Sequence, residues 1–591
     1  MKVTLISPDL QATHFKFTAK EVKSFWFAKL TLPHLAALTP DDIDVQLIDE
    51  AVEPIDFDES TDLVGITVNT YLAPRSYEIA AEFRKRGVPV VLGGVHPSLY
   101  PEEAMQHADA IAIGEAETTW VPLLRDFQRG QMKPVYRFSG YPALEGLPLP
   151  RRDLLKRGAY LTTNTIQTTR GCPFQCDFCS VTDFFGKTYR CRPLPEVMRE
   201  IETLNLDRPL VFVDDNIIGR PTYAQQLFEA MIPYKVRWGS QCSINLAHHP
   251  KLMTAAKKSG CVAMFIGIES ISQTNLNEVN KRVNHVDEYF DAIQKIHDHG
   301  IAINAGFILG MDHDDESVFE RTLEFLEKTK IEYATFHILT PVPGTPLYRR
   351  MEADGRIIDR DWSKYNGGYT VFQPRLMSPE ALEDGYYWTY HQFYSMRSIY
   401  NRVVEPKIET FYKLALNFAY KRMIKRFPKG ELPEMAKLFK SLNGDIHAMP
   451  GVNKKGLIPH TIEVTQQTMR NVGETVDRFL TIRVQPYHPL KALLVDLTGV
   501  LNGISARKLR ERIAYALERT GLDIIVNFKN VRFASKTGLR GFLPPDDRRS
   551  NGTIKCLHVP LHFRQHLEKF HQGIQFIELD EEMKQTSPEN S

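Results

Sequence analysis

Short apolar runs alternate with amphipathic segments along the first 140 residues of the chain. Strands that are covered on both faces of a sheet read as continuous apolar runs. The runs of this kind are Val3–Ile6, Val45–Ile48, Leu63–Val68, Val88–Leu92 and Ala110–Ile113. Helical patterns follow at Pro74–Arg86, Pro101–His107 and Thr118–Gln128. This alternation predicts an α/β domain over residues 1–140, with a doubly wound, Rossmann-like sheet of the flavodoxin type.

The same alternation resumes after a linker at residues 141–157, which is rich in proline and glycine. Strands are expected at Ile166–Thr169, Leu210–Val213, Ala263–Ile268, Ile303–Leu309 and Tyr333–Leu339. Polar or glycine-rich residues follow each of these runs. We therefore predict a partial TIM-type (β/α) barrel over residues 158–375, with its site at the carboxyl ends of the strands.

The last third of the chain changes character twice. Residues 376–486 are expected to form a helical extension, which includes the aromatic run Tyr386–Tyr394 and the basic amphipathic segment Phe411–Phe427. Such a segment either lies on an anionic membrane surface or packs as a core helix with extended Lys and Arg side chains. A small α/β module is expected at 487–580, followed by a disordered tail at 581–591.

Composition mainly excludes classes of function. The chain is 43% hydrophobic and 25% charged, with a formal net charge of +1, so we expect no nucleic-acid partner. No apolar stretch reaches the ~20 residues that span a bilayer. Met1–Pro8 begins with a strand-like run instead of a signal peptide, and cysteines are sparse. We expect a cytoplasmic protein, and peripheral contact with a membrane stays open.

Three of the seven cysteines form a Cys-x₃-Cys-x₂-Cys motif, at Cys172, Cys176 and Cys179. Thiolates are the preferred ligands of iron–sulfur clusters, and a [4Fe–4S] cluster has four irons to ligate. Three cysteines therefore leave one iron open to an exogenous ligand. A zinc site with a fourth ligand elsewhere is the alternative that the spacing leaves open.

The motif follows Arg170-Gly171 and has Phe178 before its last cysteine, and it resembles the cluster loop of the radical S-adenosylmethionine (SAM) superfamily. The resemblance implies that SAM chelates the open iron and is cleaved to a 5′-deoxyadenosyl radical, with a flavodoxin or ferredoxin as reductant. The residues that it implies for SAM binding are Phe178, Asp214, Asp215, Glu269, Ser270 and Gly310. For any single carboxylate, a helix cap or surface salt bridge is the alternative.

Two predicted strand ends, Gly93-Gly94 and Gly114-Glu115, resemble the cobalamin-binding domain of one class of radical SAM enzymes. The resemblance implies cobalamin as a further cofactor. The usual cobalt-ligating motif, Asp-x-His-x-x-Gly, is absent, because His14 and His34 lack its context. Cobalamin without a protein ligand on its lower face is therefore implied. The alternative is a Rossmann-like domain that serves only as a platform.

Residues 487–580 resemble STAS domains of the anti-sigma antagonist type, through Asp496-Leu497-Thr498-Gly499 and the segment 531–539. The phosphorylation switch of such domains is lost here, because Ser535 and Lys536 stand at the Asp and phospho-acceptor places. The resemblance then implies docking to a protein partner or oligomerisation.

These resemblances together imply a cobalamin-dependent C-methyltransferase, in which SAM is both radical source and methyl donor. The helical extension resembles that of enzymes that modify hopanoid or bacteriochlorophyll-type molecules, which favours a small lipophilic or polycyclic substrate. A radical reaction without methyl transfer, such as cyclisation or C–C coupling, is one alternative. A non-catalytic corrinoid or redox sensor that signals through the STAS-like module is another.

Overall fold

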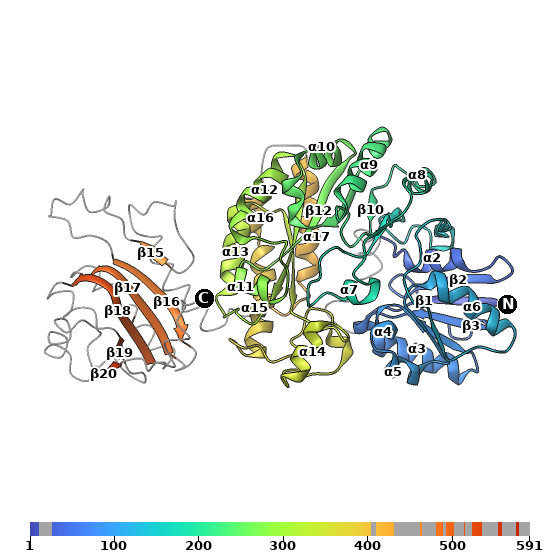
Figure 1. Cartoon of the computed structure of the whole chain (residues 1–591), viewed down its shortest axis with the longest axis horizontal. Coiled ribbons are helices and arrows are strands. Elements are labelled where there is room, and N and C mark those ends of the chain that lie inside the picture. The colour runs from blue at the N-terminus through green and yellow to red at the C-terminus, as the bar shows by residue number, and fades with distance from the viewer. Residues whose placement is uncertain are drawn as a thin grey trace. The chain divides into compact units, whose positions relative to one another are not determined.

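The computed structural model describes residues 1–10, 27–403 and 409–430, together with residue 513 and the strands of the C-terminal part. The chain divides into two compact units. The first contains Met1–Asp314 and Thr322–Glu431, and the second contains Asp315–Arg321 and Leu432–Ser591. Each unit is described by itself, and Figure 1 shows their elements.

A six-stranded parallel sheet in the order β2-β1-β3-β4-β5-β6 forms the N-terminal domain. Its strands are β1 (Lys2–Ser7), β2 (Asp44–Asp49), β3 (Leu63–Thr67), β4 (Val90–Gly93), β5 (Ala110–Ile113) and β6 (Val135–Arg137). Its helices are α2 (Thr31–Leu38), α3 (Ala73–Lys85), α4 (Val95–Leu99), α5 (Pro101–Ala104) and α6 (Ala116–Gln128). Helices α2 and α6 cover one face and α3 the other, so both faces are buried (Figure 1). The predicted flavodoxin-like sheet is confirmed.

A second six-stranded parallel sheet, in the order β14-β13-β12-β11-β10-β7, forms the partial barrel. Its strands are β7 (Thr165–Ile166), β10 (Leu210–Phe212), β11 (Trp238–Cys242), β12 (Cys261–Glu269), β13 (Ala302–Leu309) and β14 (Tyr333–Ile338). Its helices are α8 (Leu194–Glu202), α9 (Pro221–Met231), α10 (Pro250–Lys258), α11 (Gln273–Glu278), α12 (Tyr289–Asp298), α13 (Val318–Thr329) and α14 (Pro346–Ala353). The predicted partial barrel is confirmed. Strand β11 was missed, because Gly239 and Gln241 interrupt its apolar pattern.

The predicted strand Ile166–Thr169 is divided in the structure. Its first residue belongs to β7, whereas Thr169–Arg170 forms a separate short strand, β8. Strand β8 pairs antiparallel with β9 (Arg190–Cys191), and the segment between them contains the cysteine motif and α7 (Ser180–Phe185). The cysteine loop is therefore closed by a small hairpin at the mouth of the barrel.

The aromatic run of the C-terminal third closes the open edge of the barrel. It lies on α15 (Pro379–Phe393), which packs along the edge strand β14. The Tyr390 hydroxyl accepts from the Phe336 amide and donates to the Phe336 carbonyl, both at 3.0 Å. Tyr394 does the same for Ala334, at 3.4 and 2.9 Å. Both tyrosines are buried. The run therefore belongs to the core, and it gives no support to a lipophilic substrate.

Two lysines of the basic segment contact the core, whereas Arg422, Lys425 and Arg426 are exposed. The segment forms α17 (Glu409–Ile424), next to α16 (Met396–Val403). Lys413 pairs with Glu332 at 2.5 Å, and Lys421 donates to the Tyr394 carbonyl at 3.2 Å. Leu416 and Phe418 are exposed on the outer face. The core-helix interpretation accounts for Lys413 and Lys421, and membrane contact stays a prediction.

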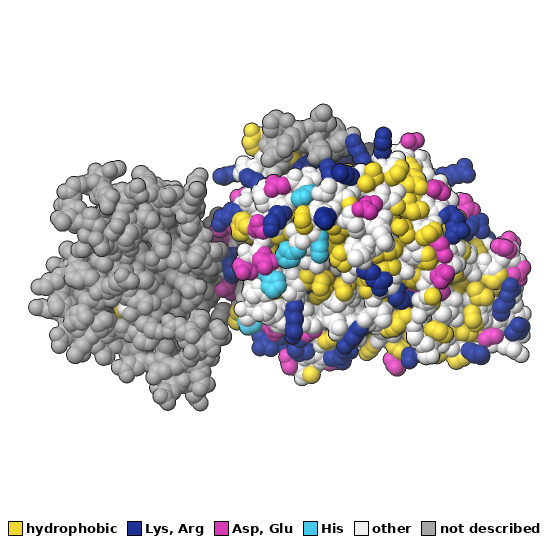
Figure 2. All heavy atoms as spheres, turned by 45° about the horizontal axis from the view of Figure 1, so that its top comes forward, with side chains coloured by type: hydrophobic (Ala, Val, Ile, Leu, Met, Phe, Trp, Pro, Cys, Tyr) yellow, Lys and Arg dark blue, Asp and Glu magenta, His cyan; other side chains and the backbone are white. Residues whose placement is uncertain are grey.

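The charge distribution on the surface and the length of the helices complete the description of this unit. Basic and acidic side chains are interspersed over the described surface in Figure 2. None of the described helices is long and apolar enough to cross a membrane.

The second unit holds a mixed sheet in the order β15-β16-β17-β18-β19-β20. Its strands are β15 (Thr461–Glu463), β16 (Leu480–Tyr487), β17 (Ala492–Leu501), β18 (Asp523–Ala534), β19 (Ile554–Leu557) and β20 (Gln575–Ile577). The pairs β15/β16 and β16/β17 are antiparallel and the others are parallel. Strands β15 and β16 occupy part of the expected helical extension, and the alternation of Leu480, Ile482 and Val484 with polar residues explains β16. Ser535, Lys536 and the tail lie outside the described residues, and the STAS-like assignment stays a prediction.

Candidate active site

The cysteine loop is held in a conformation that only glycine permits at its first residue. Gly171 has φ +84°, and a Cβ there would lie 2.1 Å from the Thr188 carbonyl oxygen. Within the loop, the Cys179 amide donates to the Cys176 carbonyl at 3.1 Å. Asp177 ties the loop to the barrel through backbone hydrogen bonds with Val279 and Leu347. The backbone around the three cysteines is thus preformed.

Burial favours the neutral form of all three thiols when no metal is bound. Burial raises the pKa of Cys176 to about 11 and that of Cys179 to about 12. A bound metal would displace their protons. No group of three or more His, Cys, Asp or Glu side chains among the described residues converges on one ion position. A cluster does not need such convergence, because each cysteine ligates a different iron.

A buried lysine supplies positive charge beside these cysteines. Lys281 Nζ lies 3.0 Å from Glu269 Oε1, and both side chains are nearly buried. Burial alone would lower the pKa of Lys281, but Glu269 and the Cys176 thiolate raise it above its usual value. Lys281 therefore stays charged and can balance a cluster of thiolates. No local motif around Lys281 indicates this role.

The predicted SAM residue Glu269 occupies a strained backbone position. It has φ +62° at a register shift between β12 and β13, a conformation that non-glycine residues seldom adopt. Ser270 is buried beside it and accepts from the Ser272 amide at 3.1 Å. Glu269 is the last residue of β12 and Ser270 follows it. Both therefore lie at the edge of the sheet where the sequence predicts the site.

The two neighbouring aspartates have different surroundings. Asp214 is fully buried and accepts from the Thr168 amide at 3.1 Å and from the Thr168 and Thr169 hydroxyls at 2.8 and 2.5 Å. Asp215 accepts from the Gly171 amide at 3.3 Å and lines a cavity. Burial, with the Asp214 charge in second place, raises the pKa of Asp215 to about 7. Asp214 thus braces the hairpin, whereas Asp215 lies between the cysteine loop and the cavity.

Of the six predicted SAM residues, Asp215 lines that cavity and the other five do not: Phe178, Asp214, Glu269, Ser270 and Gly310. Gly310 has φ +88°, and a Cβ there would lie 2.4 Å from Leu382 on α15. Close helix packing therefore explains this glycine without a ligand. Phe178 is half-buried in the cysteine loop.

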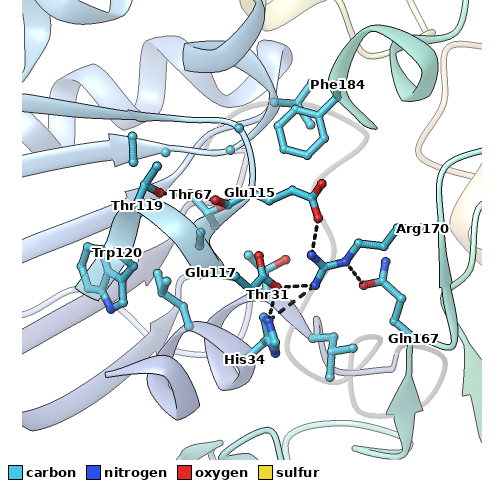
Figure 3. A pocket seen from close by; sticks show the side chains of 18 of the residues that line it. Thr31, His34, Thr67, Glu115, Glu117, Thr119, Trp120, Gln167, Arg170 and Phe184 are labelled. Carbon is cyan, nitrogen blue, oxygen red and sulfur yellow. Dashed lines mark hydrogen bonds and ion pairs between the residues drawn. The ribbon is translucent and has the colours of Figure 1, made fainter. Parts of the chain in front are cut away.

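A cavity of about 420 Å³ lies between the carboxyl edge of the N-terminal sheet and the mouth of the barrel (Figure 3). Gly93, Gly94 and Gly114 line it from the N-terminal domain, and Asp215 lines it from the barrel. A Cβ on Gly114 would meet no atom within 4 Å. Phe184 and Phe185 of α7, which the sequence did not indicate, also line it. The predicted cobalamin glycines and one predicted SAM residue therefore share one cavity of ligand size.

His34, one of the two histidines considered as cobalt ligands, lies in the described part of the chain, as does His96. His34 lines the cavity, and its Nε2 lies 2.6 Å from Glu117 Oε1. His96 is buried and lies within hydrogen-bond distance of Tyr77 and Thr70, away from the cavity lining. His14 is outside the described residues. Glu117 itself contacts Arg170 of the barrel at 2.6 Å, so the cavity wall crosses from one domain to the other.

Known families match three parts of the chain. Residues 166–326 match the Radical SAM superfamily, residues 28–124 match the B12 binding domain, and residues 345–441 match a Domain of unknown function (DUF4070). The first match contains all three cysteines of the motif. The third covers much of the expected helical extension.

Two curated proteins of Chlorobaculum tepidum are similar over most of their length. A bacteriochlorophyllide d C-12(1)-methyltransferase is 32% identical over 418 residues, which are 69% of this chain and 90% of that protein. A bacteriochlorophyllide d C-8(2)-methyltransferase is 32% identical over 395 residues, which are 64% and 87%. A solved structure of the cobalamin-dependent S-adenosylmethionine radical enzyme OxsB shares the fold, with a TM-score of 0.55 and 15% identity, over 75% of this chain and 73% of that one.

Proposed function

The chain belongs to the family of radical SAM enzymes with a B12-binding domain that includes the bacteriochlorophyllide d methyltransferases, and we propose that it methylates an unactivated carbon of a lipophilic, polycyclic substrate. The family's cofactors are a [4Fe–4S] cluster, SAM and cobalamin. The observation that carries the proposal is the shared cavity, because it joins the glycine-rich strand ends of the B12-binding domain to Asp215 beside the cysteine loop.

Each cofactor has residues that fit it. Cys172, Cys176 and Cys179 would hold the cluster, and Lys281 would balance its charge. Gly93, Gly94 and Gly114 would let cobalamin approach the backbone of the N-terminal domain, since Gly114 leaves open space in the cavity. Glu269, Ser270 and Phe178 are the proposed SAM contacts.

When bound, the cluster supplies the electron that cleaves SAM to the 5′-deoxyadenosyl radical, and cobalamin carries the methyl group. The chain's own part is to bind, orient and exclude water. Phe184 and Phe185 form an aromatic wall of the cavity, with ring centroids 4.8 Å apart. A flavodoxin or ferredoxin is the proposed electron donor.

The substrate class rests on the relatives. Two of them are named for bacteriochlorophyllide d, so a chlorin-type ring is the first substrate to test. The aromatic run of α15 no longer supports a lipophilic substrate, because it is buried against β14.

A pair of glycine variants tests the cavity assignment. Gly114→Phe places a ring in the cavity, whereas Gly130→Phe places one where a Cβ also meets nothing within 4 Å but outside the cavity lining. Both glycines have positive φ, so the backbone strain is matched. We expect Gly114→Phe to abolish cobalamin binding in an absorbance titration and Gly130→Phe to retain it. Equal binding by the two variants would contradict the proposal.

The reaction is then tested on the reconstituted enzyme with SAM, a low-potential reductant and chlorin-type acceptors. Both 5′-deoxyadenosine and a methylated product are expected. Formation of 5′-deoxyadenosine without methylation would instead indicate cyclisation or C–C coupling.

A further inference from the structure

Five ionisable side chains form a continuous series of contacts beside the cavity, and four of them, His34, Glu117, Arg170 and Glu115, line it (Figure 3). His34 contacts Glu117 at 2.6 Å, and Glu117 contacts Arg170 at 2.6 Å. Arg170 also contacts Glu115 at 2.5 Å, and Glu115 contacts Arg190 at 2.6 Å. We call this series the interdomain ion chain. Its histidine and two carboxylates come from the B12-binding domain, and its two arginines come from the hairpin around the cysteine loop.

Arg170 is the centre of the interdomain ion chain. One terminal nitrogen of its guanidinium donates to Glu115 and the other to Glu117, while Nε donates to Gln167 at 2.8 Å. The side chains of Arg170 and both carboxylates are at most 8% exposed. A guanidinium that is bound along all of its edges has one position and one orientation. Buried ion pairs add little net stability compared with apolar packing, so geometry is the better explanation of their presence.

The protonation state of Glu117 agrees with this geometry. Burial alone would raise the pKa of Glu117, but hydrogen bonds from His34 and Arg170 hold it well below its usual value. Glu117 therefore stays charged throughout the physiological range, and the contact between the domains persists.

The two partners of the contact between Arg170 and Glu115 are each adjacent in sequence to residues proposed to hold a cofactor. On the barrel side, Arg170 immediately precedes Gly171 and Cys172, and the Gly171 amide donates to Asp215 at 3.3 Å. On the other side, Glu115 follows Gly114, which opens into the cavity. A displacement of Arg170 would therefore move the cysteine loop relative to the cavity.

We propose that Arg170 is a positioning residue that fixes the distance and orientation between the iron–sulfur loop and the cobalamin cavity. This inference rests on the proposed function, because it takes cobalamin as the occupant of the cavity. Arg190 shares Glu115 but otherwise contacts the Pro142 carbonyl of the linker and does not line the cavity. It is the matched comparison, because it reaches the same Glu115 from β9, the strand after the cysteine motif, instead of from the residue directly before Gly171 and Cys172.

The test compares Arg170→Lys with Arg190→Lys in full-length protein reconstituted with cluster and cobalamin. A lysine keeps the charge but lacks the rigid planar fork that holds Glu115, Glu117 and Gln167 in one geometry. Pulsed electron paramagnetic resonance reports the distance between the reduced cluster and Co(II) of cobalamin through their dipolar coupling. We expect the wild type and Arg190→Lys to share one narrow distribution and Arg170→Lys to give a shifted or broadened one. SAM cleavage linked to methyl transfer should fall about tenfold or more in Arg170→Lys, because misplacement of about 1 Å can cost that much in rate.

Iron and cobalamin contents separate the outcomes. The inference is overturned if Arg170→Lys keeps the wild-type distribution, or if Arg190→Lys is shifted to the same extent. If Arg170→Lys loses iron or cobalamin, Glu117→Gln replaces it, since that change keeps the side-chain shape and the Glu115 contact. A wild-type distribution in Glu117→Gln then overturns the inference. Wild-type protein that takes up no cobalamin would instead overturn the proposed function, and the inference with it.

Discussion

The hydroxyls of Tyr390 and Tyr394 are predicted to stabilise the open edge of the barrel. Tyr390→Phe removes two hydrogen bonds of 3.0 Å and leaves the Phe336 amide and carbonyl without their partner. Phe336 is fully buried, so water cannot replace the hydroxyl. A buried polar group left unpaired costs about 1–3 kcal/mol, which gives a loss of about 2–6 kcal/mol for the two groups. Tyr394→Phe should cost less, because its contact with the Ala334 amide is 3.4 Å long.

Hydrogen exchange followed by mass spectrometry is the appropriate assay, since a chain with several domains need not unfold in one step. The peptide that contains β14 should exchange faster in Tyr390→Phe, and the peptides of the N-terminal sheet should not change. Tyr400→Phe is the control, because that side chain is 67% exposed and its loss should change stability by less than about 0.5 kcal/mol. Unchanged protection of β14 in Tyr390→Phe would refute the reasoning. Altered substrate preference without loss of protection would return the aromatic run to the substrate site.

Three further predictions concern the cysteine loop and the second half of the chain. Gly171→Ala should lose cluster iron in an iron assay. Gly158→Ala should keep it, because Gly158 also has a positive φ but no atom lies within 4 Å of a Cβ added there. Equal iron contents in the two variants would contradict the packing argument. Cys172→Ala should remove the cluster absorbance and Cys191→Ala should not, and the reverse result would contradict the ligand assignment. Burial opposes ionisation of Glu332, but its basic neighbours lower its pKa from 4.5 to about 2, so its ionised form stabilises the fold by about 3 kcal/mol above pH 4.5. Glu332→Gln should therefore destabilise the region around β14 by about 3 kcal/mol at pH 7 and by progressively less as the pH falls to about 3. Hydrogen exchange of the peptide that contains β14, corrected for the intrinsic exchange rate at each pH, measures this, and a constant difference would contradict it.

Local patterns were enough to predict the two parallel sheets and the cluster loop. Apolar runs such as Val3–Ile6 and Ala110–Ile113 are buried on both faces, so their sequence carries the strand signal directly. The cysteine motif is equally local: its spacing indicates metal ligation, and the flanking Arg170-Gly171 and Phe178 favour an iron–sulfur cluster over zinc through the family resemblance. Strand β11 carries no such run and could not be found in this way.

Contacts between distant residues could not be predicted. Arg170 and Glu115 are 55 positions apart, and nothing in either segment indicates the other. The sequence predicts Gly310 as a ligand contact and does not show that Leu382 of α15 also approaches it closely. Asp214 and Asp215 are adjacent in sequence, and only the tertiary structure shows that one braces a hairpin while the other faces the cavity.

The central claim is that one active site combines radical SAM chemistry with cobalamin-dependent methylation. Its most direct test is anaerobic incubation of the reconstituted enzyme with bacteriochlorophyllide d, a low-potential reductant and SAM that carries a deuterated methyl group. Mass spectrometry should detect 5′-deoxyadenosine together with a product that has gained the deuterated methyl, and both should require added cobalamin. If no 5′-deoxyadenosine forms, and Cys172→Ala behaves like the wild type, the claim is contradicted.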